Sequence, residues 1–361
     1  MSIPLLVVCL STLTVAAQIG YAPRTDLDAG HYLKAQGEAE ARLVANPSDA
    51  LALAVKAQAL TSQMRFGEAA AQAGRAATLN PGLADAYLAR GLARAGTTIQ
   101  QRSFSSLRSA SGAMDDLRNA TQLDPAFQSA WMSLGLAYQQ LPGLLGGSNR
   151  KALACAEALA RLDPVKGDLL RGTILTLDGR WGEAEPCLLR ALAKAPGDPQ
   201  VVAGFLSALG EKATQKALGE AAQRQRLVAE AIRLLPPVRR SGRGVEAISL
   251  ALLDGGQPEQ AWKMALEALP ACDAPSLVRL QLGKIAARSG LHRPEGLAFL
   301  DQALREPLEG GSGGYPAAHW RRGQILKDLG RTDEARKAAQ AALALDLRHR
   351  GAAKLLEELG D

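Results

Sequence analysis

Apolar residues recur along most of this chain with the spacing of amphipathic helices, and prolines divide the pattern into units of similar length. Pro81 follows the apolar stretch Ala76–Leu79, and Pro125 follows Ala120–Leu123 in the same way. A proline cannot continue the helix before it, so each proline is predicted to end one helical unit and begin the next. The prolines of this set are Pro47, Pro81, Pro125, Pro164 and Pro196.

The intervals between these prolines point to an internal repeat. The first interval, from Pro47 to Pro81, is 34 residues, and the next three are 44, 39 and 32 residues. The longer intervals contain insertions, which we place at residues 97–110 and 141–149. A repeat of this length is typical of stacked helical hairpins that share one continuous core.

Short motifs recur inside the units. Trp131, Leu134, Gly135 and Tyr138 follow the pattern W-x-x-L-G-x-x-Y. An acidic residue followed by alanine opens the predicted second helix of four units, at Glu68-Ala69, Glu183-Ala184, Glu259-Gln260-Ala261 and Glu334-Ala335. Over residues 48–347 the chain resembles the tetratricopeptide repeat family, with about eight repeats. This resemblance implies an all-α fold, a right-handed α-solenoid of helical hairpins whose concave surface is lined by the first helix of each repeat.

Glycines fall in the middle of the predicted first helices, where glycine weakens a helix. Alanines mark the facing positions of the second helices. We therefore expect small side chains to let the two helices of each hairpin approach closely. The glycines are Gly91, Gly135, Gly172, Gly283 and Gly323.

The ends of the repeat array are predicted to be capped, because a stack of repeats must cover its terminal apolar faces. One helix is expected at residues 27–45, and a final amphipathic helix at 348–359. Residues 236–244, which are Pro-, Arg- and Gly-rich, and the glycine-rich stretch 310–314 are predicted to be joints within one solenoid. The expected divisions are 1–17, a signal peptide; 18–47, an N-terminal segment and capping helix; 48–235, repeats one to five; 236–309, repeats six and seven; and 310–361, the connector, the last repeat and a capping helix.

The N-terminal residues are predicted to form a targeting signal. No charged side chain occurs from Ser2 to Pro23, and Ile3–Ala17 is almost continuously apolar. Small residues at Val15-Ala16-Ala17 favour cleavage after Ala17, which predicts a periplasmic or secreted protein. An uncleaved segment would instead anchor the chain to a membrane, and a cytoplasmic chain with an apolar start is the third alternative.

Composition supports the all-α prediction and adds little about partners. Aromatic residues make up 4% of the chain, and 42 basic residues are interspersed with 36 acidic ones, for a net charge of +6. Mixed charges of this kind indicate a solvated surface, and basic residues without aromatic interleaving argue against nucleic-acid binding. Cys155 and Cys187 fall at equivalent positions of neighbouring second helices, too far apart for a disulfide, so both are predicted to be small buried hydrophobes.

Catalytic and cofactor motifs are missing from the sequence. None of the histidines, His31, His292, His319 and His349, has a metal-ligand partner at helical spacing. The sequence has no H-E-x-x-H motif, no zinc-type cysteine pairs and no G-x-S-x-G motif. The glycine-rich stretch 143–151 lacks the Gly-Lys-Ser/Thr ending of a phosphate loop and is predicted to be structural. We therefore predict a protein that is not an enzyme and binds no cofactor or metal.

Two kinds of surface are candidates for binding. The inserted segments carry apolar residues that either contact a partner or plug the solenoid: Ile99, Phe104, Leu107, Leu141, Leu144 and Leu145. The concave surface is apolar in its first half, with Leu51, Leu88, Leu92, Met132, Leu136, Leu169 and Thr173, and basic later, with Arg243, Lys284, Arg288, Trp320 and Lys327. From both surfaces we predict the partner-binding residues Leu88, Leu92, Met132, Leu136, Leu144, Leu145, Leu169 and Thr173.

An apolar groove that becomes basic suits an amphipathic or acidic-tailed peptide. The carboxylate clamp of chaperone-binding family members is missing at the corresponding positions, Ala54 and Gln58. Arg239, Arg240 and Arg243 form either a solvated basic joint or an anion site. The leading hypothesis is a non-catalytic scaffold that binds a protein or peptide. The alternative is a periplasmic carrier of a small molecule, and an enzyme of unrecognised type comes third.

Overall fold

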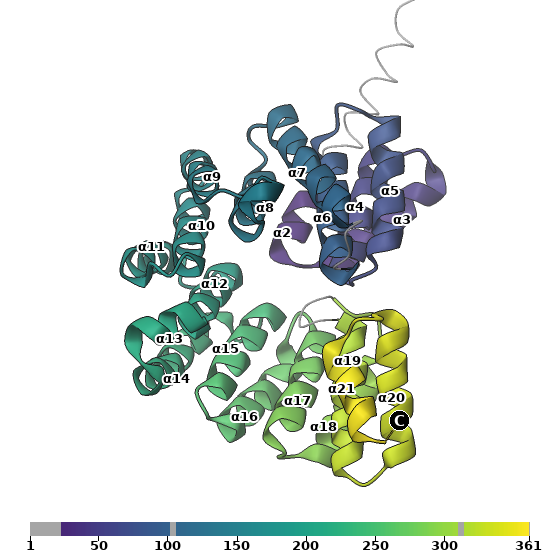
Figure 1. The fold of residues 1–361 in the computed structure, drawn as a ribbon, viewed down its shortest axis with the longest axis vertical. Helices are drawn as coiled ribbons and strands as arrows, with labels where there is room; N and C mark the ends of the chain where they lie inside the picture. The colour runs from purple at the N-terminus through teal and green to yellow at the C-terminus, as the bar shows by residue number, and fades with distance from the viewer. Residues whose placement is uncertain (1–22, 102–105, 310–313, 361) are drawn as a thin grey trace, which may run out of the picture.

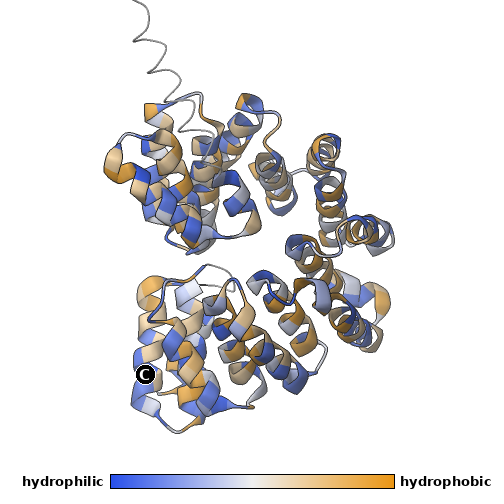
Figure 2. Ribbon diagram, turned by 180° about the vertical axis from the view of Figure 1, so that it is seen from behind, coloured by the Kyte–Doolittle hydropathy of each residue, from blue (hydrophilic) through white to orange (hydrophobic). Residues whose placement is uncertain are grey.

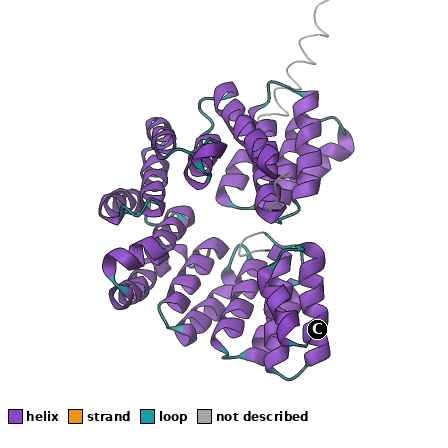
Figure 3. Ribbon diagram, viewed as in Figure 1, coloured by secondary structure: helices purple, strands orange, loops and turns teal. Residues whose placement is uncertain are grey.

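The structure is a computed structural model that describes residues 23–101, 106–309 and 314–360, except for the side chains of residues 99–109 and of Leu144. The described part of the chain consists of helices joined by turns (Figure 3). No described helix has the length and apolar character needed to span a membrane. The predicted signal peptide and the connector residues 310–313 lie outside the described residues.

The helices alternate as first and second helices of hairpins, as the resemblance implies. The first helices are α4 (Ala50–Ser62), α6 (Ala84–Gln101), α8 (Gln128–Gln140), α10 (Pro164–Leu177), α12 (Pro199–Gly210), α15 (Gly242–Asp254), α17 (Pro275–Ser289) and α19 (Gly314–Asp328). The second helices are α5 (Phe66–Leu79), α7 (Ser106–Leu123), α9 (Asn149–Leu162), α11 (Trp181–Lys194), α14 (Glu220–Val238), α16 (Pro258–Ala268), α18 (Arg293–Ala303) and α20 (Thr332–Leu345). Each first helix packs against the second helix that follows it, which confirms the α-solenoid.

Local sequence explains where the hairpins begin and turn. Asp163 and Asp198 cap α10 and α12, each accepting hydrogen bonds from two backbone N–H groups, and a proline occupies the first turn after each cap. Gly179, Gly256 and Gly330 precede second helices with φ values of +78°, +82° and +75°, the left-handed conformation expected of glycine in these turns.

Close packing explains the glycines of the first helices. A Cβ atom at Gly172 would lie 2.5 Å from Leu188 Cγ, and one at Gly283 would lie 2.3 Å from Leu300 Cγ. Contacts of this length leave no room for a side chain, so the predicted role of these glycines in hairpin packing is confirmed.

The stack curves until its two halves face each other (Figure 1). The backbone N–H of Leu33, in the N-terminal half, donates to Glu309 Oε1 at 3.1 Å in the C-terminal half. Figure 2 shows the same arrangement from behind, with apolar residues recurring along the helices of both halves. The largest core cluster extends along the stack from Leu169 in α10 to Ala338 in α20, so the repeats share a continuous core.

The two predicted insertions and the predicted Pro-rich joint each take a different form in the structure. The insertion at 97–110 lengthens two helices: α6 ends at Gln101 and α7 begins at Ser106. The insertion at 141–149 instead contains the short 3-10 helix η1 (Gly143–Leu145). Within the predicted joint at 236–244, the chain turns at Arg239–Ser241 between α14 and α15, and Pro236 and Pro237 lie in the last turn of α14. Near the C-terminus of a helix a proline removes only the last hydrogen bonds, so α14 continues through both prolines.

Repeat five holds an additional short helix, α13 (Lys212–Leu218), between its two main helices. The C-terminal capping helix is α21 (Arg350–Glu358), and it buries Leu355 against the last repeat. Cys155 and Cys187 are free and buried, as predicted. Burial raises the pKa of Cys155 to about 12, so its thiol stays protonated and unreactive.

The N-terminal helix predicted at 27–45 is divided into two. α2 (Pro23–Ala29) and α3 (Tyr32–Ala45) meet at Gly30, which has a φ of +82°. α3 packs on α4 and caps the stack, whereas α2 turns back into the curve of the solenoid beside α6 and α8 (Figure 1). The prediction of one capping helix is therefore wrong, because a glycine in the left-handed conformation ends α2.

Candidate functional site

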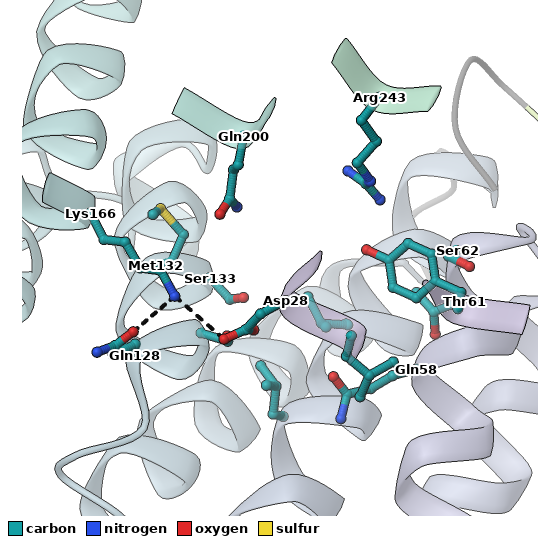
Figure 4. A pocket seen from close by; sticks show the side chains of 15 residues that line it. Asp28, Gln58, Thr61, Ser62, Gln128, Met132, Ser133, Lys166, Gln200 and Arg243 are labelled. Carbon is teal, nitrogen blue, oxygen red and sulfur yellow. Dashed lines mark hydrogen bonds and ion pairs between the residues drawn. The ribbon is translucent and has the colours of Figure 1, made fainter. Parts of the chain in front are cut away.

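A cavity of about 330 Å³ lies on the concave side of the solenoid, where α2 meets the first helices (Figure 4). It brings together residues from distant parts of the chain. The lining residues are Leu27, Asp28, Tyr32, Gln58, Thr61, Ser62, Leu88, Leu92, Gln128, Ser129, Met132, Ser133, Lys166, Gln200 and Arg243. We call it the central cavity.

The first turns of four successive first helices face the central cavity. Gln128, Lys166, Gln200 and Arg243 lie in the first turns of α8, α10, α12 and α15 and all line it. The N-terminus of a helix carries a partial positive charge. The curvature of the stack therefore directs positive helix ends, together with two cationic side chains, toward one volume.

The α2 segment forms one wall of the central cavity. Asp28 accepts hydrogen bonds from Ser129 Oγ and, at 3.4 Å, from Lys166 Nζ. The same Lys166 ammonium donates to Gln128 Oε1 at 2.8 Å. These contacts connect α2 to α8 and α10, and the neighbouring Leu27, which also lines the cavity, is buried.

Arg24 anchors the α2 segment outside the cavity. Its guanidinium donates to both oxygens of Asp85 at 2.7 and 3.0 Å and to Asp124 Oδ2 at 2.8 Å, and it stacks on the Phe127 ring at 3.8 Å. The hydrogen bond to Asp85, which is 1% exposed, holds the pKa of Arg24 above its usual value. A bidentate ion pair with a buried carboxylate fixes the position of α2.

Arg243 forms the opposite wall. Its guanidinium lies 5.2 Å from the centre of the Tyr32 ring, and a Cβ atom at Gly30 would fall 1.9 Å from Arg243 Nε. Gly30 is therefore required both for its backbone conformation and for the space that Arg243 fills. Among the described residues Arg243 forms no ion pair at contact distance, and Glu309 acts on it only electrostatically, so its guanidinium can still bind a ligand.

Gln58 presents an unused hydrogen-bond donor. Its side chain is 9% exposed, and Nε2 has no hydrogen-bond partner among the described residues. The neighbouring hydroxyls of Thr61 and Ser62 donate to backbone carbonyls of their own helix. A buried amide donor without a partner costs free energy, which a ligand acceptor would recover.

The chemistry of the central cavity is that of a binding site. Leu27, Leu88, Leu92 and Met132 supply apolar surface, and amides, hydroxyls and two cations supply polar contacts. Asp28 is the single acid among the described lining residues, and it is already paired. The described residues contain no cluster of His, Cys, Asp and Glu suited to a metal ion.

Three of the eight predicted binding residues, Leu88, Leu92 and Met132, line the central cavity. Leu136 and Leu169 pack into the core, and the Thr173 hydroxyl donates to Leu169 O. Leu145 lies in η1, away from the cavity lining, and the side chain of Leu144 lies outside the described part of the chain.

Sequence reasoning missed Asp28, Tyr32, Lys166 and Gln200 as cavity residues. The first two come from the N-terminal segment, and no local sequence pattern predicts that this segment turns toward the concave side. The other two follow the Asp-Pro signals that start α10 and α12. Applying the repeat register to the first turns of these two helices, as well as to their middles, would have placed both residues on the concave surface.

A second cavity of about 370 Å³ adjoins the first and shares Arg243 with it. It lies between α12 and α15, with Leu206, Leu227 and Leu250 as apolar lining and Glu246 among its polar residues. The two cavities together extend the concave binding surface from repeat one to repeat six.

Comparison with known proteins agrees with the hairpin fold. The family model for the tetratricopeptide repeat matches residues 316–349, which cover α19 and α20. No curated protein matches the chain.

Three solved structures with a similar fold are a chain of the APC/C hetero-tetramer Cut9-Hcn1, yeast Tom70, and pilF of Pseudomonas aeruginosa. Their sequence identities are 12%, 15% and 18%, and their TM-scores are 0.43, 0.48 and 0.40. The matches cover 91%, 91% and 65% of this chain and 53%, 62% and 98% of the others. The chain thus spans about half the length of the first of them.

Proposed function

We propose that this chain, a tetratricopeptide repeat protein by its match over residues 316–349, is a non-catalytic scaffold that binds a segment of a partner protein on its concave surface. The carrying observation is the central cavity, where apolar side chains, an unpaired Arg243 and an unpartnered Gln58 amide share one volume. Tetratricopeptide folds typically bind proteins or peptides, and the concave side of a solenoid is the surface that its curvature provides for binding.

The electrostatics of the central cavity favour an acidic segment as the partner. Two cationic side chains and the positive ends of α8, α10, α12 and α15 face it, against the single carboxylate of Asp28. Leu92 and Met132 would contact apolar side chains of the same segment. An extended acidic segment with one or two apolar residues meets both requirements.

We further propose that the protein works in the periplasm or outside the cell. The apolar, uncharged run before Gln18 supports export, with cleavage after Ala17. Retention of this run would instead attach the same concave surface to a membrane. Sequencing the N-terminus of the protein from its native cells separates the two, because the cleaved form begins at Gln18.

Aspartate substitutions in the central cavity test the scaffold proposal. Met132→Asp and Leu92→Asp add a negative charge beside an acidic partner, and each is expected to weaken capture of that partner from a cell-envelope fraction at least about tenfold. Leu345→Asp, at a site 50% exposed in α20, is the matched control and is expected to keep it. If both cavity variants fold, as judged by circular dichroism, and retain every partner, the concave assignment is wrong.

A carrier of a small molecule is the second candidate. The central cavity, at about 330 Å³, falls in the size range of small-ligand sites. Native mass spectrometry of freshly purified protein distinguishes the two functions, because a carrier retains a ligand of fixed mass and a scaffold does not.

A further inference from the structure

A pair of basic side chains lies in a separate cavity near the C-terminal end of the solenoid. Lys284 of α17 and Arg321 of α19 line this volume of about 120 Å³ with the indole of Trp320. The other lining residues are Leu280, Leu300, Gly314, Ala317 and Ala318. This second basic site shares no residue with the central cavity.

Lys284 and Arg321 have no carboxylate within ion-pairing distance in the described part of the chain. Arg321 Nη1 donates to the neutral amide of Gln324 at 2.8 Å, and its guanidinium stacks on Trp320 at 3.8 Å. Other basic residues of the same two helices are paired: Arg288 with Asp254, Arg322 with Asp301 and Lys327 with Glu358. The missing counter-charge is therefore a property of this pair.

Both cations are also half-buried. Burial lowers the pKa of Lys284, and burial together with Arg288 lowers the pKa of Arg321 to about 10. Glu246 and Asp254 partly offset this lowering for Lys284, and they contact Gln281 and Arg288. A partly desolvated positive charge without a partner is costly, and an anion in the site would reduce that cost.

Size and charge restrict the anion. A volume of about 120 Å³ admits a single compact group. Two cations that lack counter-charges match a group with two negative charges, and a phosphate monoester carries about −1.5 to −2 at neutral pH. Lysine binds phosphate oxygens as a point charge, and the N–H groups of Arg321 not bonded to Gln324 supply further donors.

We propose that Lys284 and Arg321, with Trp320 beside them, form a binding site for a phosphate dianion, either free or as the monoester of a small molecule. This inference goes beyond the scaffold proposal and does not depend on it. Phosphate binding here would add a second ligand to the solenoid, on α17 and α19, the two first helices that follow α15 of the central cavity.

Isothermal titration calorimetry on the full chain at neutral pH and constant ionic strength tests the site. Sodium phosphate is expected to bind, and sodium acetate at least about tenfold more weakly because it carries a single charge. Lys284→Met and Arg321→Met should each weaken phosphate binding at least about tenfold. The matched control is Arg322→Met, the next residue on the same helix, whose guanidinium is paired with Asp301. It is expected to bind phosphate as the wild type does.

The melting temperatures of the variants show whether weaker binding is caused by loss of the site or by unfolding. Removing a desolvated, unpaired cation is expected to leave the melting temperature equal to or above that of the wild type, so weaker binding reports the site. Glycerol 3-phosphate in place of phosphate identifies the source: tighter binding assigns a monoester, and weaker binding assigns free phosphate. Equal binding of phosphate and acetate, or an equal loss in Arg322→Met, would overturn the proposal.

Discussion

Replacement of Asp116 by alanine is expected to lower the free energy of unfolding by about 3 kcal/mol. The Asp116 side chain is 3% exposed and accepts hydrogen bonds from Arg90 at 2.6 and 3.0 Å and from Arg94 at 2.6 Å. These bonds join α6 to α7 in the longest hairpin of the solenoid. Without Asp116, two guanidinium groups on the inner side of the hairpin lose their counter-charge.

The adjacent Asp115 is the matched control. Its side chain is 60% exposed and pairs with Arg118 one turn along the same helix. Asp115→Ala is expected to cost less than about 0.5 kcal/mol, because an exposed ion pair is screened by water. Urea unfolding followed by circular dichroism measures both changes. Losses of similar size would show that burial of Asp116 does not stabilise the hairpin.

Gly167→Ala is expected to lower the free energy of unfolding by about 2 kcal/mol. A Cβ atom at Gly167 in α10 would lie 2.4 Å from Ala160 Cα and 2.7 Å from Ala160 N in α9. Both obstacles are backbone atoms, which cannot move as a side chain can. The two helices would have to separate, and that cost exceeds the gain of about 1 kcal/mol in helix propensity.

Gly74→Ala in α5 provides the opposite expectation. Apart from its chain neighbours and the backbone of its own helix, no described atom lies within 4 Å of a Cβ built at this position. The substitution is expected to raise stability by up to about 1 kcal/mol, because alanine favours the helix and loses less chain entropy. Thermal unfolding of both variants shows whether the change in stability is negative for Gly167→Ala and positive for Gly74→Ala. A Gly167→Ala protein as stable as the wild type would contradict the close contact of α9 and α10.

The repeat architecture could be predicted from sequence because its signals are local and recur. The Asp-Pro starts of α10 and α12 and the turn glycines Gly179 and Gly330 each act within a few residues. Repetition then sets the register, and two of the residues that the register places on the concave surface, Leu92 and Met132, line the central cavity. Fold class and part of the central cavity follow from this reasoning alone.

The inward course of α2 could not be predicted, because it depends on contacts between distant residues. Arg24 binds Asp85 and Asp124, which lie 61 and 100 residues along the chain. The helical pattern from Leu27 to Ala45 gives no sign of these pairs, and glycine at position 30 is compatible with either a continuous helix or a break.

Curvature of the stack explains why Leu169 is not at the surface. The register places it on the concave side of α10, but a Cβ atom at Gly204 of α12 would lie 2.5 Å from Leu169 Cδ1. The next first helix therefore covers this leucine. A repeat register describes one hairpin at a time and does not include the rotation between neighbours.

Site-specific photo-cross-linking in the native cells shows which surface the partner touches. A photoreactive residue replaces Met132, which lines the central cavity, or Leu345, which is exposed on a second helix. Binding on the concave surface predicts a cross-linked partner from position 132, lost in the presence of Leu92→Asp, and none from position 345. A partner captured from position 345 but not from position 132 would contradict it.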